Sequence, residues 1–389
     1  METILVKGPI AMKVRGECEI LGVKFKNTFI IYQNNKYLPI EKNTDTILSL
    51  KKGKNYFNLE KNSKYEQDQI GTNIWGSIIE CILNSNRKRI IIIGPSDTGK
   101  STLTLFIANK LLNKGLRPLI IDSDIGQGEL SPPTCIGATI LSKQTIDLAR
   151  VNPYYVNFIG DIQPVGYESR IINCIKNSYD KLNKNNNVTI INTDGFVNNN
   201  ENNYKIDLIK KIDPDCIICM RENDQTIDLF DSIIEEFSGN LNIKIIQGQA
   251  PHREIRKTSY DRRAKRLIKY SNLLKTFTKK VFISKHRVIA IYYQNSFLLS
   301  GRNTETEMIN GIGSKDKIIK DLLNNRNFVR NRFVGLSLKE DYEKITGFGI
   351  LKEFNKGYFM IQSSINKFDN IFLSDIKLYN NNTSLFNKK

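Results

Sequence analysis

The sequence predicts an α/β domain built on a mainly parallel sheet, with a small β domain on each side of it. Three observations support this fold class. Short strands separated by turns fill residues 1–66, strands alternate with helices from 87 to about 248, and strand patterns return after about 280. At 389 residues, the chain is long enough for two or three domains.

The first β domain is expected over residues 1–66. Alternating or apolar stretches occupy Lys13–Leu21, Val23–Tyr32 and Thr46–Leu50. Turn residues such as Gly16 and Gly22 separate them. A helical pattern then opens near Thr72 and leads into the central domain, expected over 67–280.

The central domain should contain five strands with helices near 100–114, 168–183, 204–212 and 226–237. Because such alternation produces parallel strands covered on both faces, ligands should bind at the carboxyl ends of the strands. The predicted strands are Arg89–Ile93, Leu119–Ile121, Val188–Asn192, Asp215–Met220 and Ile243–Ile246.

A basic, helical segment at 251–270 closes the central domain, and a second β domain is expected over 281–389. Its predicted strands are Val288–Tyr292, Phe333–Leu338, Phe348–Leu351, Tyr358–Ile361 and Phe372–Leu378.

The chain is strongly basic, with a net charge of +18. Such an excess favours a polyanionic partner, above all a nucleic acid, although a solvated lysine-rich surface is an equal alternative. Binding to nucleic acid should weaken with salt. No apolar run approaches the ~20 residues of a membrane span, and the N-terminus lacks a signal-peptide pattern. A cytoplasmic location without membrane attachment is therefore expected.

Residues 94–101 read Gly-Pro-Ser-Asp-Thr-Gly-Lys-Ser, which fills every required position of G-x-x-x-x-G-K-S. The apolar run Ile90–Ile93 precedes the motif and a helical pattern follows it, as a P-loop requires. The central domain is therefore predicted to be a P-loop NTPase domain that binds ATP. Lys100 should reach the β- and γ-phosphates, and Ser101 should ligate Mg²⁺ or another divalent cation. The residues expected to contact the nucleotide are Gly94, Pro95, Ser96, Asp97, Thr98, Gly99, Lys100, Ser101 and Thr102.

Two carboxylates, Asp122 and Asp124, end the second predicted strand and should point to the same side of it. Beside a P-loop, one carboxylate can hold the metal and the other can accept a proton from an attacking hydroxyl. Gln127 offers a neutral amide to the metal or to the nucleophile. A plain surface turn is the alternative interpretation.

Two further segments follow. Thr193 and Gly195 could present a hydroxyl and backbone groups to phosphate, and Phe196 offers a stacking face for a base. A polar turn with Phe196 in the core is the alternative. Arg262 and Arg266 lie four residues apart on one predicted helix face, where arginine can grip phosphate oxygens. A solvated helix face is the alternative there.

These four motifs, in this order, resemble the polynucleotide 5′-hydroxyl kinase family of the Clp1, Grc3 and Nol9 type, especially its archaeal members. The resemblance includes the P-loop at 94–101, the acidic motif D-x-D-x-G-Q at 122–127, a "clasp" at 193–196 and a lid R-x-x-x-R at 262–266. It extends over nearly the whole chain through similarities such as Gly8-Pro9 and the Gly347–Leu351 stretch.

The resemblance implies transfer of the γ-phosphate of ATP to the 5′-hydroxyl of single-stranded RNA, with DNA left open as an acceptor, in RNA processing or repair. It assigns catalysis to Lys100, Asp122, Asp124, Arg262 and Arg266, with Asp124 favoured as the base. It assigns the metal to Ser101, Asp122 and Gln127, and the acceptor to Gln127, Thr193, Gly195 and Phe196. Phe196 stands where the family usually has Trp, so the stacking area is smaller. RNA-processing proteins are possible partners.

Two other functions compete with a kinase. Some relatives are structural, so the chain could be an ATP-bound scaffold subunit without turnover, although such a protein should carry a damaged motif. A GTPase or assembly ATPase is the third option, but Asn192-Thr193-Asp194 does not supply the N-K-x-D guanine motif.

Overall fold

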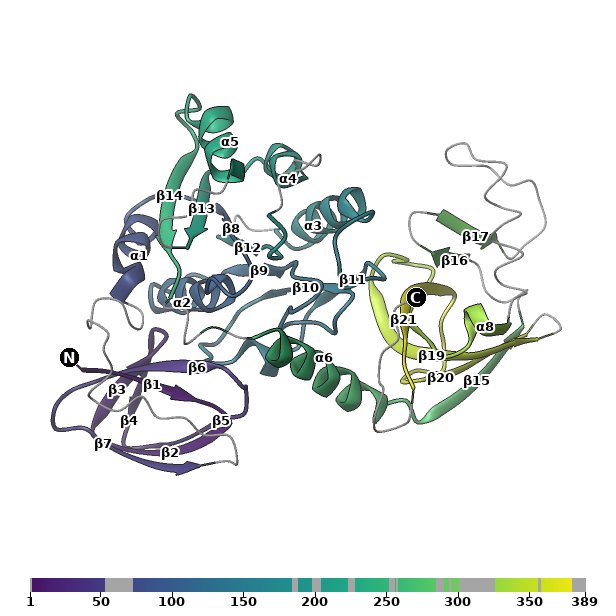
Figure 1. Ribbon diagram of the computed structural model, residues 1–389, viewed down its shortest axis with the longest axis horizontal. Coiled ribbons are helices and arrows are strands. Elements are labelled where there is room, and N and C mark those ends of the chain that lie inside the picture. The colour runs from purple at the N-terminus through teal and green to yellow at the C-terminus, as the bar shows by residue number, and fades with distance from the viewer. Residues whose placement is uncertain are drawn as a thin grey trace.

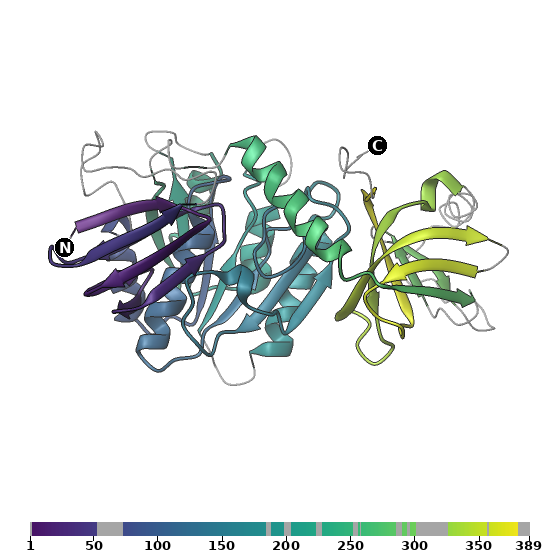
Figure 2. The ribbon, with the colours of Figure 1, turned by 90° about the horizontal axis from the view of Figure 1, so that it is seen from below.

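The computed structural model describes residues 2–52, 73–183, 188–197, 204–222, 228–251, 256, 258–284, 290–293, 296–300, 326–355 and 358–379. Three units lie in a row, with a β domain on either side of a central α/β domain (Figures 1 and 2). The predicted fold class is confirmed.

The N-terminal domain consists of two small sheets. One has the strand order β1 (Glu2–Lys7), β6 (Tyr37–Lys42), β3 (Glu17–Ile20), β4 (Val23–Lys26), and the other has the order β5 (Phe29–Tyr32), β2 (Ile10–Arg15), β7 (Ile47–Lys52). Two predicted stretches each divide into two strands. The breaks fall at Gly16 and Asn27, where φ is +99° and +45°. Backbone in this left-handed region cannot continue a strand.

The central sheet has the order β11-β10-β9-β12-β8-β13-β14. Its five parallel strands are those the sequence predicts: β9 (Leu119–Asp122), β12 (Thr189–Asn192), β8 (Arg89–Ile93), β13 (Cys216–Arg221) and β14 (Lys244–Gln249). Two strands not predicted, β10 (Cys135–Ile140) and β11 (Tyr155–Phe158), extend the sheet in antiparallel fashion.

Helices cover both faces of this sheet. The 3₁₀ turn η2 (Asn73–Trp75) leads into α1 (Gly76–Leu83), which packs with α2 (Lys100–Asn113) on the face of Ile90 and Ile92. On the face of Ile91 and Ile93 pack α3 (Glu168–Leu182), α4 (Tyr204–Ile212) and α5 (Asp228–Phe237). Because alternate residues of β8 are buried on opposite faces, the strand is apolar throughout, as buried parallel strands are.

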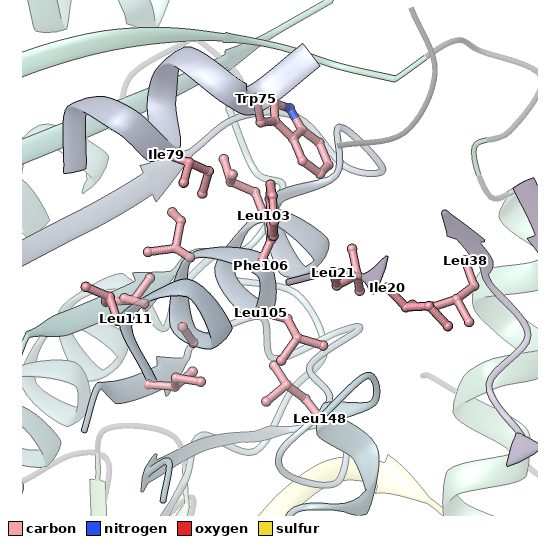
Figure 3. Close-up of a cluster of buried hydrophobic side chains, with 14 of the residues drawn as sticks. Ile20, Leu21, Leu38, Trp75, Ile79, Leu103, Leu105, Phe106, Leu111 and Leu148 are labelled. Atoms are coloured by element: carbon pink, nitrogen blue, oxygen red, sulfur yellow. The ribbon is translucent and has the colours of Figure 1, made fainter. Parts of the chain in front are cut away.

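The N-terminal domain shares its core with the central domain. Figure 3 shows Ile20 and Leu21 beside Leu105 and Phe106 of α2. All four side chains belong to one buried cluster, which also includes Leu148 in the 3₁₀ turn η3 (Leu148–Arg150). This shared core fixes the N-terminal domain next to the start of α2, where the P-loop lies.

Helix α6 (Ser259–Leu274) runs from the central domain to the C-terminal domain (Figure 2). Tyr270, near the C-terminal end of α6, and Phe277, just beyond that end, pack with Phe158 of the central sheet and Phe333 of the C-terminal sheet. Within the described part of the chain, no helix combines the length and apolar character needed to cross a membrane. The C-terminal sheet has the order β15 (Lys279–Ser284), β20 (Tyr358–Ser363), β19 (Ile345–Asn355), β18 (Arg332–Ser337), β21 (Asn370–Lys377), β16 (Ala290–Tyr293), β17 (Ser296–Ser300), with α8 (Arg326–Val329) beside it.

Candidate active site

The P-loop connects β8 to α2 and wraps around its own lysine. Gly99, with φ +90°, precedes the first helical residue, Lys100. The Lys100 ammonium donates to the carbonyl oxygens of Gly94 at 2.8 Å and Pro95 at 2.6 Å. Thr98 is buried and its hydroxyl donates to Pro95 O at 2.9 Å, which stiffens the loop.

Lys100 and Asp124 influence each other's charge. Burial lowers the pKa of Lys100 to about 8, and the Asp124 carboxylate opposes this shift. Burial also raises the pKa of Asp124, and Lys100 opposes that shift in turn. A buried cation and a buried carboxylate therefore face the same space, each stabilising the charge of the other.

The acidic motif places its two carboxylates in different surroundings. Asp122 Oδ2 accepts from the N–H groups of Glu129 (2.5 Å) and Leu130 (3.2 Å). Asp124 Oδ1 accepts from the N–H groups of Gly126 (3.1 Å) and Gln127 (2.8 Å), while Asp124 also lines the central cavity. Asp122 is thus held by the loop, and Asp124 faces the space where a ligand fits.

Asn192 links the P-loop to the acidic motif. In the register of β12, it lies beside Asp122 of β9 and Ile92 of β8. Its amide nitrogen is 2.9 Å from Asp122 Oδ1 and 3.2 Å from Ser101 Oγ. The parallel sheet therefore brings Ser101 and Asp122 to the two sides of one amide.

The loop after β12 contacts the P-loop directly. A Cβ atom on Gly195 would lie 2.1 Å from Ser96 Oγ and 2.6 Å from Ser96 N, so only glycine fits there. Thr193 is fully buried and its hydroxyl donates to Ile92 O at 2.8 Å. Phe196 is partly buried, with its ring centroid 6.2 Å from that of Tyr204.

Helix α6 contacts the loop between β9 and β10 (residues 123–134, the acidic loop) through two lysines. Lys265 donates to Gln127 O at 2.7 Å, and Lys269 donates to the carbonyls of Glu129 (3.2 Å) and Ser131 (2.9 Å). Burial lowers the pKa of Lys265, and the Asp124 carboxylate opposes this shift. The contacts anchor the helix beside the site.

The two predicted lid arginines differ in their partners. Arg262 forms an ion pair with Asp97 of the P-loop, and Gln127 Nε2 donates to the Arg262 carbonyl at 3.2 Å. Arg266 forms no hydrogen bond or ion pair within the described ranges, and burial lowers the pKa of its guanidinium. Arg266 is a half-buried cation one helical turn after Arg262.

A cavity of about 130 Å³ joins these elements to the N-terminal domain. The predicted residues that line it are Ser96, Asp97, Gly99, Lys100, Ser101, Thr102, Asp124 and Gln127. Gly94, Pro95, Thr98, Asp122, Arg262, Arg266 and the 193–196 loop lie outside the lining. The remaining lining residues are Leu5, Lys7, Asn35, Lys36, Tyr37, Pro39, Trp75, Pro251, Arg256 and Asp261.

The sequence interpretation assigned no role to several residues of this site. Asn192 carried a weak signal, as a polar residue at the end of an apolar strand. Lys265 lies three residues after Arg262 and so on the same side of α6, but the R-x-x-x-R pattern passed over it. Lys36 carried no signal, because it reaches the cavity from a segment distant in sequence. Arg256 lies in the basic segment 251–270, but no pattern within that segment marked it.

Comparison with known proteins supports the resemblance that the four motifs indicate. Residues 94–272 match the family model of the mRNA cleavage and polyadenylation factor CLP1 P-loop. A polyribonucleotide 5′-hydroxyl-kinase of Methanocaldococcus jannaschii is 30% identical over 166 residues, which make up 42% of this chain and 45% of that protein. A protein with the same description from Pyrococcus horikoshii is 33% identical over 138 residues, which make up 35% of this chain and 38% of that protein.

The chain thus matches less than half the length of these curated relatives. A solved structure of the wild-type Clp1p–Pcf11p complex contains a chain with the same fold, at a TM-score of 0.68 and 15% identity over 96% of both chains. The family match, the archaeal relatives and the shared fold all agree with the resemblance stated from the motifs. Over residues 94–272, this chain is similar to the Clp1 P-loop family.

Proposed function

We propose that this protein transfers the γ-phosphate of ATP to the 5′-hydroxyl of single-stranded RNA. The observation that carries the proposal is the position of Asp124, which lines the same cavity as Lys100 and Ser101. A proton acceptor beside a phosphate cradle suits attack by a hydroxyl group. The archaeal relatives named as polyribonucleotide 5′-hydroxyl-kinases favour RNA as the acceptor.

The nucleoside of ATP should lie between the P-loop and the N-terminal domain. That end of the cavity is lined by Leu5, Tyr37 and Pro39 from one side and by Trp75 and Pro251 from the other. Apolar and aromatic side chains of this kind suit a flat base, while the phosphates reach the amides of the P-loop and the N-terminus of α2.

The site also fits a divalent cation. Two buried side-chain oxygens, Gln127 Oε1 and Asn192 Oδ1, accept no hydrogen bond within the described segments. Gln127 Oε1, Ser101 Oγ and the Asp122 carboxylate are oxygen atoms of the kind that Mg²⁺ prefers. Ser101, Asp122 and Gln127 would hold the ion, which would neutralise charge on the phosphates.

The transfer step needs a proton acceptor and cations around the phosphoryl group. The 5′-oxygen forms a bond to the γ-phosphorus, the bond from that phosphorus to the bridging oxygen breaks, and ADP leaves. Asp124 accepts the 5′-hydroxyl proton. Lys100 exchanges its carbonyl partners for phosphate oxygens, and Arg262 and Arg266 stabilise the charge that moves onto the leaving group.

The direct test is transfer of label from γ-labelled ATP to a 5′-hydroxyl oligoribonucleotide. We expect labelled RNA, a loss of at least ~10²-fold with Lys100→Ala, and loss of transfer when EDTA removes the divalent ion. Retention of ATP without transfer would favour the scaffold instead. Hydrolysis of GTP without RNA would favour a GTPase. Competition between matched RNA and DNA oligonucleotides measures the acceptor preference.

A further inference from the structure

Three polar side chains are buried together behind the 193–196 loop. Asp194 is 4% exposed, Tyr204 3% and Lys205 2%. The Lys205 ammonium donates to Asp194 Oδ2 at 3.0 Å and to the Tyr204 hydroxyl oxygen at 2.6 Å, and the Tyr204 hydroxyl donates to Asp194 Oδ2. The ammonium also lies 4.4 Å from the centroid of the Tyr204 ring. None of these groups has a part in the transfer step described above.

This buried network holds the loop that faces the P-loop. Asp194 Oδ1 accepts from the N–H of Phe196 at 2.8 Å, so the carboxylate braces the turn from the inside. Gly195, between these two residues, packs on Ser96 without room for a side chain. The Phe196 ring packs near Tyr204. Any shift of Asp194 therefore moves the surface that the loop presents to the phosphate site.

The network is costly if stability alone is considered. Both charged groups of a buried ion pair lose their hydration, and apolar residues of similar volume often stabilise a core as well or better. Burial lowers the pKa of Lys205, and the Asp194 carboxylate opposes the shift. What such a pair supplies is a fixed geometry, because its hydrogen bonds admit few alternative arrangements.

We propose that Lys205 is a positioning residue for the acceptor: by holding Asp194, it sets residues 194–196 against the P-loop and fixes where the 5′ end of the RNA enters. The inference rests on the proposed kinase function. It assigns specificity to the first turn of α4, where Lys205 donates to Asp194 and to the Tyr204 hydroxyl oxygen. It also requires that replacement of Lys205 changes the KM for the RNA acceptor and not the KM for ATP.

The test compares the KM values of both substrates. Lys205→Met leaves Asp194 without its cation, and we expect KM for a 5′-hydroxyl oligoribonucleotide to rise by at least about tenfold, since a small displacement of a positioning loop is amplified at the reacting atoms. KM for ATP should stay within about twofold of wild type. Lys205→Gln, whose amide can still donate to Asp194, should recover most of the acceptor affinity.

A control and a second variant keep the result clear. Lys210→Met changes an exposed lysine of the same helix, paired with Glu236, and should leave both KM values unchanged. If Lys205→Met does not fold, Tyr204→Phe removes one hydroxyl from the network and should raise the acceptor KM alone.

Equal changes in both KM values, or no change in either, would overturn the inference. An inactive wild-type protein would instead refute the kinase function itself, so the two failures are distinguishable.

Discussion

Lys100 combines burial with a proposed role in phosphate binding that needs its charge. Its pKa of about 8 means that, in the free enzyme, the ammonium loses its proton as the pH rises through 8, well below the usual 10.5. The neutral amine attracts phosphate less, so kcat/KM for ATP should fall above about pH 8. On the acidic side, Asp124 must be ionised to accept a proton, and its raised pKa moves the loss of activity to a higher pH than an ordinary carboxyl would.

A pH profile of kcat/KM for ATP measures the loss of activity on both the alkaline and the acidic side. We expect a bell-shaped profile whose alkaline limb reports Lys100 in the free enzyme. Bound phosphate raises the pKa of Lys100 again, so this limb should be weaker in the pH profile of kcat. An alkaline limb that begins only near 10.5 would contradict the assignment to Lys100.

Gly195 offers a steric test of the contact between the two loops. Gly195→Ala places a methyl group against backbone and side-chain atoms of Ser96, so the P-loop or the 193–196 loop must move. We expect kcat/KM to fall by about 10²-fold or more with the fold retained. Gly76→Ala is the matched control, because nothing lies within 4 Å of the added methyl group and alanine is the better helix former there. Similar activities of the two variants would refute the role of the contact.

At the scale of elements, α6 is held in place chiefly by lysines. Lys269 donates to three carbonyl groups of the acidic loop, those of Gly128, Glu129 and Ser131. Lys269→Met should free the loop, displace Arg262 and Arg266, and lower kcat more than it raises KM for ATP. The exposed Lys275→Met, at the C-cap of the same helix, should have no effect. A steady-state comparison of the two variants decides the matter, and equal kcat values would contradict the anchoring role.

The sequence predicted the elements whose signal is local. The apolar run of β8, the glycines of the P-loop and the helix after it are neighbours along the chain, and all five parallel strands were found in this way. Strands β10 and β11 lie outside the five strands predicted from the alternation with helices, because they pair in antiparallel fashion, and β11 is buried partly against the C-terminal domain. Such strands depend on partners far away in sequence.

The same distinction explains what was found of the site. Ser101, Asp122 and Asp124 follow strands, so their meeting at one sheet edge was predictable from the parallel order. Lys36 reaches the site across the fold, and no local pattern marks it. Lys265 and Arg256 lie in the basic segment 251–270, but their contacts in the site depend on how the chain folds. The roles of the predicted residues stay predictions until the variants are measured.

At the scale of the whole molecule, one carboxylate of the acidic loop connects the N-terminal domain with α6. Glu129, 6% exposed, forms an ion pair with Lys36 of the N-terminal domain and lies 3.5 Å from Lys265 of α6. Its own N–H holds Asp122. Asn35 and Tyr37, the neighbours of Lys36, line the cavity. The N-terminal domain is thereby tied to the acidic loop as well as to the shared apolar core.

Lys36→Met tests this connection. We expect a loss of about 1–3 kcal/mol in the free energy of unfolding, since the buried Glu129 loses one of its partners, and a severalfold rise in KM for ATP. Urea unfolding and steady-state kinetics measure the two effects. Lys26→Met is the control, because the Lys26–Glu17 pair is 71% and 59% exposed and should contribute little. A KM for ATP equal to that of wild type would show that the tie between the N-terminal domain and the acidic loop does not affect ATP binding.

The C-terminal end of α6 is anchored, and this limits how the helix can move away from the P-loop. The helix has 16 residues, so it spans about 24 Å, and it contains no Gly or Pro at which it could bend. Tyr270 is fixed in the aromatic cluster beside the C-terminal domain. Any opening must therefore be a rotation of the intact helix about that end, with Arg262 travelling farther than Lys265 and Lys265 farther than Lys269. We expect the contacts to separate in that order, so that Arg262, the arginine nearest the P-loop, leaves first and returns last.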